Sequence, residues 1–375
     1  MKTFTYQLPS SLSFDNCTAV EVDIIAQLKK DNYDQVILDA SKTKYISSAG
    51  LRVVLSVKKN YDNLLFINAS TEVYDILEMT GFTKIIDVER SLASISIDGC
   101  PLIGKGAHGT VYRLAPDTIV KVYTDDTSLE DIKNERELSK KAFVLGLPTA
   151  IALQIVKVDD KYGTIFELLN ATSCSTYINE SQENTDDFVN KAVAILKRMH
   201  RVEVKDGSLP NMKQEAFKYL DKSKNLLDDD TYNGLYQLIN DIPDCYTLIH
   251  GDFHLKNQLM VGHDLMLIDM DTLSVGHPLF EFGMICNAYS EFSMLDPESV
   301  VNFLGISIEK AGYLWSNISR KYYDDLNDAQ YELEMNKVRA LGCMRALHFY
   351  NKRHYPKELL DKCLSHLKEA LSKVR

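Results

Sequence analysis

Two aspartates and an asparagine lie on adjoining loops of the segment TLIHGDFHLKNQLMVGHDLMLIDMD, residues 247–271. Asp252 follows a β-rich run, Asn257 comes five residues later, and a hairpin made of QLMV and LMLI leads to Asp269. Carboxylate and amide oxygens are ligands that Mg²⁺ prefers, and a carboxylate can also orient an attacking hydroxyl. These residue types therefore meet the needs of phosphoryl transfer, in which the protein mainly positions groups and neutralises charge.

The neighbours of these three residues each admit two interpretations. His250 is either a hydrogen-bonding part of the loop or a second base, and the sequence favours the loop role. His254 and Lys256 either contact phosphate or only shape the loop. Asp271 either binds a second ion or orders the turn that follows Asp269.

A glycine-rich loop lies upstream, in LIGKGAHGTVYRL, residues 102–114. Gly104, Gly106 and Gly109 form G-x-G-x-x-G, and a backbone without Cβ atoms can approach phosphate oxygens closely. In dinucleotide-binding folds the same glycines open a helix. Here they are followed by the β-branched and aromatic run TVYRL, which predicts a strand and favours the kinase type of loop.

Lys121, in the strand-like run TIVKVY, lies twelve residues after the last glycine. A lysine on this strand can reach the α and β phosphates of a nucleotide, whereas the alternative is an exposed strand lysine. The glycines before it and the helical segment SLEDIKNERELSKKAFVLG after it favour the nucleotide-binding role.

The motif HGD-x-x-x-x-N resembles the catalytic loop of aminoglycoside phosphotransferases, choline kinases and related small-molecule kinases, where protein kinases carry H-R-D. The resemblance covers residues 98–375 and implies a protein-kinase-like fold that uses ATP and Mg²⁺. It implies that Asp252 is the base or hydroxyl-orienting group. Asn257 and Asp269 are then the metal ligands.

The same resemblance extends the nucleotide site. It implies that Glu135 forms the ion pair that holds Lys121, with Glu137 as the alternative on the solvent face of the helix. Adenine would bond the backbone carbonyl of Glu167 and the amide of Leu169, where the small lobe passes into the large one.

The first part of the chain resembles STAS domains, the module of anti-sigma-factor antagonists. The phrase LDASKTKYISSAGLRVVL, residues 38–55, carries the resemblance. In regulated members the serine directly before the glycine of this phrase, here Gly50, accepts a phosphate. In this sequence that position is Ala49. Ser47 and Ser48 are adjacent hydroxyls, although serine is also a common helix cap.

The pattern of strands and helices predicts an α/β STAS-like domain followed by an α+β bilobal kinase-like fold. We place the STAS-like domain at 1–97, a β-rich nucleotide-binding lobe at 98–170 and a helical lobe with the acceptor pocket at 171–375. A chain of 375 residues exceeds what a single core usually organises.

Composition excludes several function classes. The formal net charge is −11 and no long basic cluster offsets it, so nucleic acid is not expected as a partner. No stretch is apolar enough to anchor the chain in a membrane. Seven scattered cysteines without metal-ligand spacing indicate reduced thiols and a cytoplasmic protein.

The expected function is phosphoryl transfer from ATP, with Mg²⁺, to a hydroxyl of a small molecule, with an amine-bearing acceptor as one option. The fused STAS-like domain raises two alternatives, a protein serine kinase and a nucleotide-sensing module that acts through a protein partner of that domain. No activation-segment signature such as A-P-E follows Asp269, which argues against the protein kinase.

Overall fold

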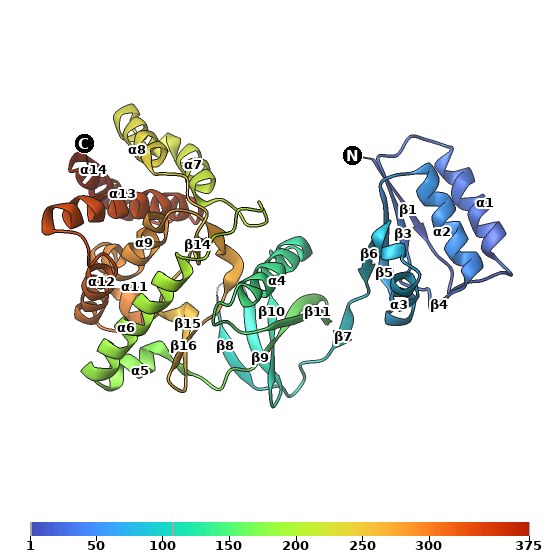
Figure 1. Cartoon of the computed structure of the whole chain (residues 1–375), viewed down its shortest axis with the longest axis horizontal. Helices are drawn as coiled ribbons and strands as arrows, with labels where there is room; N and C mark the ends of the chain where they lie inside the picture. The colour runs from blue at the N-terminus through green and yellow to red at the C-terminus, as the bar shows by residue number, and fades with distance from the viewer. Residues whose placement is uncertain (1, 107–108, 375) are drawn as a thin grey trace. The chain divides into compact units, whose positions relative to one another are not determined.

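The computed structural model describes residues 2–106 and 109–374 (Figure 1). These residues divide into two compact units after Ser96, and the short segment Val156–Asp160 belongs with the first unit. None of the described helices is long and apolar enough to cross a lipid bilayer.

The first unit is built on a four-stranded parallel sheet in the order β1-β3-β5-β6. Its inward-facing positions, among them Leu38 and Phe66, are fully buried, and α1 and α2 lie side by side (Figure 1). Ser47 is the N-cap of α2, because its hydroxyl accepts a hydrogen bond from the Gly50 amide at 3.2 Å. The capping role of this serine is therefore observed directly.

The elements of the first unit are β1 (Thr3–Gln7), β2 (Ser11–Leu12), α1 (Cys17–Leu28), β3 (Gln35–Asp39), β4 (Tyr45–Ile46), α2 (Ser48–Asn60), β5 (Leu64–Ala69), α3 (Thr71–Met79), β6 (Asp87–Arg90) and β7 (Ala93–Ile95).

The second unit begins with a sheet in the order β11-β12-β10-β9-β8, in which neighbours from β12 to β8 are antiparallel. Helix α4 follows β10 and begins with a capping box formed by Ser128 and Asp131. The elements are β8 (Leu102–Lys105), β9 (Gly109–Ala115), β10 (Thr118–Tyr123), α4 (Leu129–Val144), β11 (Ala152–Val158) and β12 (Lys161–Glu167).

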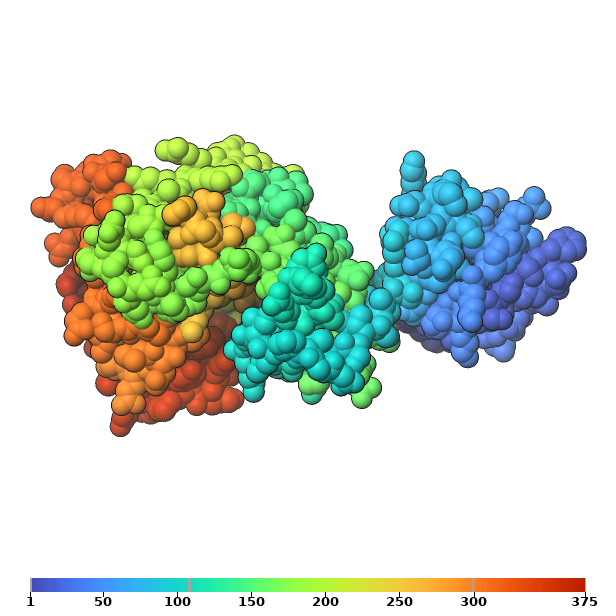
Figure 2. Space-filling view, turned by 90° about the horizontal axis from the view of Figure 1, so that it is seen from below, coloured from blue at the N-terminus to red at the C-terminus, as the bar shows by residue number. Residues whose placement is uncertain are grey.

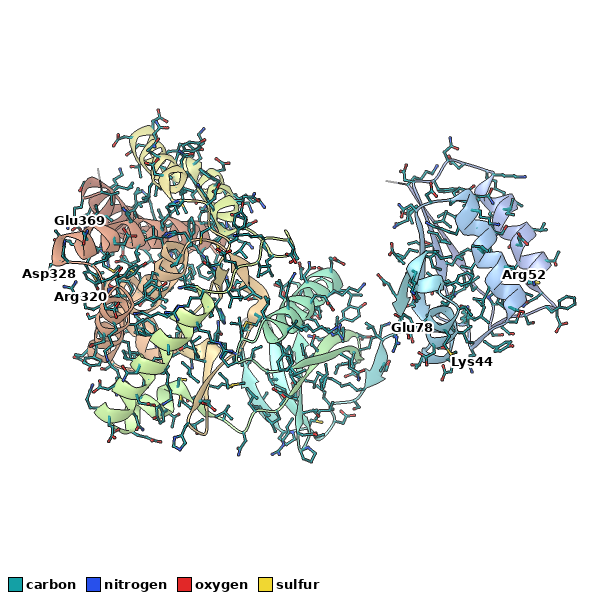
Figure 3. The ribbon with its side chains drawn as sticks, in the orientation of Figure 1. Lys44, Arg52, Glu78, Arg320, Asp328 and Glu369 are labelled. Atoms are coloured by element: carbon teal, nitrogen blue, oxygen red, sulfur yellow. The ribbon has the colours of Figure 1, made fainter. Side chains whose placement is uncertain are left out.

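The rest of the second unit is mostly helical and shares one continuous apolar core. The hairpin β15–β16 contacts α5 and α6, and Figure 2 shows its gold tip against their green surface. Arg320 of α12 pairs with Asp328 at the start of α13 (Figure 3).

The strands of this lobe are β13 (Thr172–Ser173), β14 (Leu248–Ile249), β15 (Gln258–Val261), β16 (Asp264–Leu267) and β17 (Ser274–Val275). Its α-helices are α5 (Cys174–Glu180), α6 (Gln182–Met199), α7 (Met212–Lys222), α8 (Asp229–Asp241), α9 (Pro278–Cys286), α10 (Phe292–Leu295), α11 (Pro297–Leu304), α12 (Ile308–Tyr322), α13 (Asp328–Lys352) and α14 (Lys357–Ser372).

Helices α9 and α13 pack backbone to backbone. A Cβ on Gly342 of α13 would lie 2.5 Å from the carbonyl oxygen of Gly283 in α9. The Asn287 side chain donates a hydrogen bond to the Gly342 carbonyl at 2.7 Å and holds the same contact. This close approach fixes α9 against the core. The buried acid Glu281 lies in the first turn of α9, three residues after the helix begins.

We expect Gly342→Ala to lower the free energy of unfolding by about 1 to 3 kcal/mol, because the added methyl must push α9 away. Gly312→Ala is the matched control, since Gly312 is also helical and a Cβ there meets no atom within 4 Å. The control should gain about 0.5 to 1 kcal/mol from helix propensity. Thermal unfolding followed by circular dichroism compares the two, and equal midpoints would contradict the role of this contact.

Candidate active site

The loop after β14 is held in place by a buried carboxylate. Glu281 of α9 is fully buried, and its two oxygens accept hydrogen bonds from the backbone amides of His250 at 2.6 Å and Gly251 at 3.0 Å. Gly251 has φ +81°, and a Cβ there would lie 2.7 Å from the Thr272 carbonyl oxygen. A glycine is therefore required in this turn.

Burial raises the pKa of Glu281 to about 7, although the two amides and Arg345 favour its charged form. Sequence reasoning missed this residue. The signal was present, because an acid inside the apolar helix PLFEFGMIC must find a buried partner.

His250 is completely buried and lies inside the loop. Its Nδ1 accepts a hydrogen bond from the Asp252 amide at 3.3 Å, and its Nε2 lies 3.2 Å from the Ile268 carbonyl oxygen. Burial lowers the pKa of the imidazole, which favours the neutral form. With both ring nitrogens engaged, His250 shapes the loop.

The Asp252 carboxylate is accessible at one oxygen. Its Oδ2 accepts a hydrogen bond from Asn257 Nδ2 at 2.8 Å and lies 3.2 Å from His254 Nε2. Burial raises the pKa of Asp252, but His254, Arg345 and His250 outweigh it and lower the pKa to about 2. The other oxygen, Oδ1, accepts no hydrogen bond from the described residues, so a charged carboxylate oxygen is available to a ligand.

Asn257 links the loop to the strand that leads to Asp269. Its side-chain nitrogen donates to both the backbone oxygen and the carboxylate of Asp252. Its backbone carbonyl accepts a hydrogen bond from the Ile268 amide at 2.9 Å. The side-chain oxygen of Asn257 has no donor among the residues described. An amide oxygen presented in this way is a suitable ligand for a hard cation.

Lys121 of β10 joins three elements. Its ammonium lies 2.8 Å from Glu135 Oε1 of α4 and 3.0 Å from Asp269 Oδ1 in the loop after β16. Burial opposes the charge, but the carboxylates of Asp269 and Glu135 prevail and raise the pKa of Lys121. Glu137 instead pairs with Arg136 and Lys140 on the solvent side, at 64% exposure.

Asp269 and Asp271 form the acidic end of the site. Asp269 has φ +63°, a left-handed conformation that aspartate tolerates at some cost. Asp271 is exposed to water, yet partial desolvation and the carboxylates of Asp269 and Glu135 raise its pKa to about 7. A bound cation beside these two carboxylates would favour the charged form of Asp271.

The donor set matches Mg²⁺ better than a metal held by protein alone. Among the residues described, no group of three His, Cys, Asp or Glu side chains could hold a metal ion. Mg²⁺ in nucleotide sites needs fewer protein ligands, because waters and phosphate oxygens complete the octahedron. Asp269 and the amide oxygen of Asn257 are the groups that could hold Mg²⁺ in this way.

The glycine loop and the strand end are placed on the same sheet. Gly109 pairs with Tyr123 of β10, and a Cβ there would lie 2.5 Å from the Val122 carbonyl oxygen, so this glycine serves strand packing. A Cβ on Gly104 would meet nothing, and one on Gly106 nothing closer than 3.9 Å, which leaves that side open to a ligand. Ala107 and His108 lie outside the described residues.

The segment expected to bind adenine follows β12. Glu167 is the last residue of β12 and pairs with Thr118 of β10. The Leu169 amide donates no hydrogen bond to any described residue, whereas the Leu168 amide donates to the Asp117 carbonyl at 2.7 Å. The Leu169 amide is thus unbonded within the part of the chain that the structure describes.

A pH experiment tests the buried carboxyl. Since the folded-state pKa of Glu281 is raised from 4.5 to about 7, its contribution to stability is full below pH 4.5 and is lost as the pH rises through 7. From pH 5 to pH 8, the free energy of unfolding of the wild type should therefore fall by about 2 to 3 kcal/mol relative to Glu281→Gln. Parallel pH profiles in urea unfolding would contradict this assignment.

Comparison with known proteins gives a family match for each of the two regions of the chain. The phosphotransferase enzyme family matches residues 99–304, and the STAS domain family matches residues 2–95. A putative anti-sigma factor antagonist of Bordetella bronchiseptica, BtrV, is 36% identical over 80 residues, which cover 20% of this chain and 68% of that protein.

Two solved structures that align with this chain are the following. The GDP complex of an aminoglycoside 2'-phosphotransferase of type IIIa aligns with 13% identity and a TM-score of 0.50, over 80% of this chain and 96% of that one. A choline/ethanolamine kinase family protein from Mesorhizobium loti aligns with 14% identity and a TM-score of 0.48, over 73% and 92%. The expected fold class, a STAS domain before a β-rich and a helical lobe, is confirmed. The family match covers more than half of the 375 residues, so the chain belongs to the phosphotransferase enzyme family and carries a STAS domain in front of the phosphotransferase region.

Proposed function

We propose that this protein transfers the γ-phosphoryl group of ATP, in the presence of Mg²⁺, to a hydroxyl group of a small molecule. The observation that carries the proposal is the pairing of Lys121 with both Glu135 and Asp269, beside a loop in which Asn257 holds a charged Asp252. Membership of the phosphotransferase enzyme family supports it. The cytosol, with its ATP and Mg²⁺, is the compartment that suits this reaction.

Each side chain has a distinct role in the proposed reaction. Lys121 exchanges its contact with Asp269 for the phosphates of the nucleotide, and Glu135 keeps the ammonium in position. Mg²⁺ held by Asn257 and Asp269 would neutralise charge on the phosphates. Gly104, Gly106 and Gly109 bring backbone to the phosphates, while the backbone of Glu167 and Leu169 binds the base.

Asp252 acts on the acceptor. The acceptor oxygen forms a bond to the γ-phosphorus, the bond from that phosphorus to the bridging oxygen breaks, and ADP leaves with the bonding electrons. The hydroxyl proton passes to Asp252. A carboxylate with a pKa near 2 is a weak base, so it first orients the hydroxyl and takes the proton late, as the new bond forms.

The STAS domain is proposed as a module that binds a protein partner. Alanine has no hydroxyl, so position 49 cannot accept a phosphate, and Ser47 is engaged as the cap of α2. Ser48, the next residue, is exposed, so its hydroxyl is accessible to modification. A gain of one phosphate in the mass of the chain itself, incubated with Mg²⁺ and ATP, would favour the signalling alternative over a small-molecule acceptor.

Replacing Asp252 by asparagine keeps the shape of the side chain and removes the negative charge. We expect Mg²⁺-dependent ADP production, stimulated by a pool of small alcohols that includes both neutral and amine-bearing compounds, to fall about a thousandfold in Asp252→Asn. Asp264→Asn is the control, because Asp264 is exposed in the β15–β16 hairpin and should leave the rate unchanged. Equal loss in both variants, or none in either, would remove Asp252 from the mechanism.

The two glutamates of α4 provide a second matched pair. Glu135→Gln removes the charge that holds Lys121, and we expect kcat/KM for ATP to fall on the order of tenfold to a hundredfold. Glu137→Gln changes the same group two residues away on the solvent face and should leave kcat/KM unaltered. Steady-state kinetics with varied ATP distinguishes the two, and a larger effect at Glu137 would reverse the assignment.

A further inference from the structure

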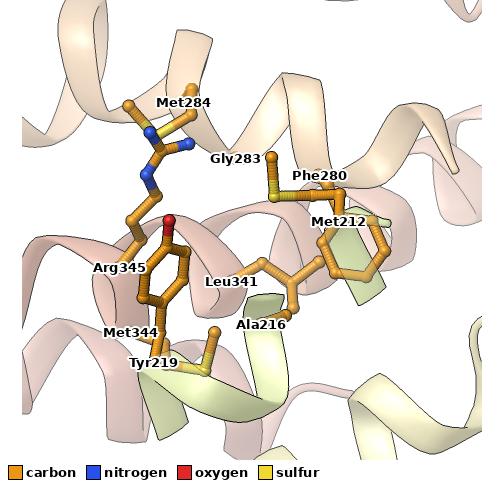
Figure 4. Close-up of a pocket in the computed structure, with 9 residues that line it drawn as sticks. All are labelled: Met212, Ala216, Tyr219, Phe280, Gly283, Met284, Leu341, Met344 and Arg345. Atoms are coloured by element: carbon orange, nitrogen blue, oxygen red, sulfur yellow. The ribbon is translucent and has the colours of Figure 1, made fainter. Parts of the chain in front are cut away.

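Two cations lie at the loop that carries Asp252, and the nearby carboxylates of Asp269 and Asp271 are the ones that the proposed Mg²⁺ would neutralise. Arg345 of α13 donates a hydrogen bond to the Gly251 carbonyl at 2.7 Å, beside Asp252, and its guanidinium lies over the Tyr219 ring (Figure 4). Lys256 is exposed within the loop. An ammonium group on the acceptor would meet these cations as it approached Asp252, and like charges at short range repel.

The acids of the adjacent helices are largely engaged elsewhere. Residues 278–304 contain four acids. Glu281 is bound by two backbone amides, and buried Glu291 is paired with Arg339 at 2.7 Å and with His366 at 2.7 Å. Asp296 has a partner as well, and Glu298 is exposed at the start of α11. A polycation needs several available carboxylates, and residues 278–304 offer one.

An aromatic ring lies next to the loop instead. Phe303 of α11 is half exposed, at 50%, while Val300 and Leu304 of the same helix are buried in the core. Its ring meets the His254 ring edge to face, with centroids 5.3 Å apart at 78°. His254 in turn lies 3.2 Å from Asp252 Oδ2. One imidazole therefore separates an exposed aromatic ring from the carboxylate that orients the acceptor.

We propose that the acceptor is an alcohol that carries an apolar portion beside its hydroxyl and no ammonium group, and that Phe303 contacts this apolar portion. The inference rests on the proposed function, since it places the acceptor hydroxyl on Asp252. It departs from an amine-bearing acceptor, the option that the sequence left open. An exposed phenylalanine that a ligand covers gives up its contact with water, which contributes to binding.

Acceptors that share one skeleton test the charge requirement. Phenylalaninol carries an ammonium group next to its alcohol, N-acetylphenylalaninol replaces it by a neutral amide, and 3-phenyllactate carries a carboxylate. With the full chain, Mg²⁺ and ATP, we expect acceptor-dependent ADP formation with kcat/KM at least tenfold higher for the two compounds without the amine. Kanamycin and choline, as amine-bearing acceptors of different shape, should be poorer still.

Variants test the contact. Phe303→Ala should raise KM for N-acetylphenylalaninol roughly tenfold and change kcat less than threefold, because the lost contact is the same in the bound and the transition state. Phe143→Ala is the control, since Phe143 of α4 is exposed to a similar extent, 48%, on the other lobe. KM for ATP should stay unchanged in both.

The outcomes distinguish a failure of the acceptor inference from a failure of the proposed function. ADP formation stimulated by phenylalaninol, kanamycin or choline in preference to the neutral and anionic alcohols would leave the proposed function standing and overturn the inference. Equal KM values for Phe303→Ala and Phe143→Ala would also overturn it. No acceptor-dependent ADP from any compound, with Asp252→Asn indistinguishable from the wild type, would overturn the proposed function and the inference with it.

Discussion

The chain of charges from Glu135 through Lys121 to Asp269 is the interaction on which the rest of the site depends. It joins a helix and a strand of the β-rich lobe to the loop that follows β16 in the helical lobe. One cation between two carboxylates in a largely buried setting is strongly favoured in its charged form, and its two ion pairs tie the two lobes together. In the proposed reaction the same ammonium turns to the phosphates of the nucleotide, because Asp269 then has the Mg²⁺ as another positive partner.

A second constraint is the conformation of the loop that carries Asp252. The loop that carries Asp252 has no regular secondary structure to define it, and its backbone amides at His250 and Gly251 would be unsatisfied without Glu281. Glu281 can hold them only because α9 is fixed against α13 by the close backbone contact at Gly342. Helix packing far from the chemistry thus determines where a carboxylate of the site points, and Arg345 adds a further bond from α13 to the Gly251 carbonyl.

Much of the arrangement could be predicted from local patterns. The glycine loop, Lys121 and the trio Asp252, Asn257 and Asp269 lie in short motifs whose spacing follows from strand and turn geometry. Glu281, Arg345 and Phe303 were not predicted, because their partners lie 30, 94 and 49 positions away in the chain, separations at which no spacing rule applies. The left-handed backbone conformation of Asp269 was not predicted either, because the residue type alone does not determine its φ value. Gly109 has in addition a packing role that the motif does not reveal, because a Cβ there would lie 2.5 Å from the Val122 carbonyl oxygen.

The central claim is that a phosphoryl group moves from ATP to a small alcohol. Phosphorus-31 NMR of the purified chain with Mg²⁺, ATP and a mixture of small alcohols follows that group directly. The account predicts that a phosphomonoester resonance grows as the γ-phosphate resonance of ATP declines, with ADP formed in equal amount. Loss of the γ-phosphate into inorganic phosphate alone, or its recovery only on the protein, would contradict the account.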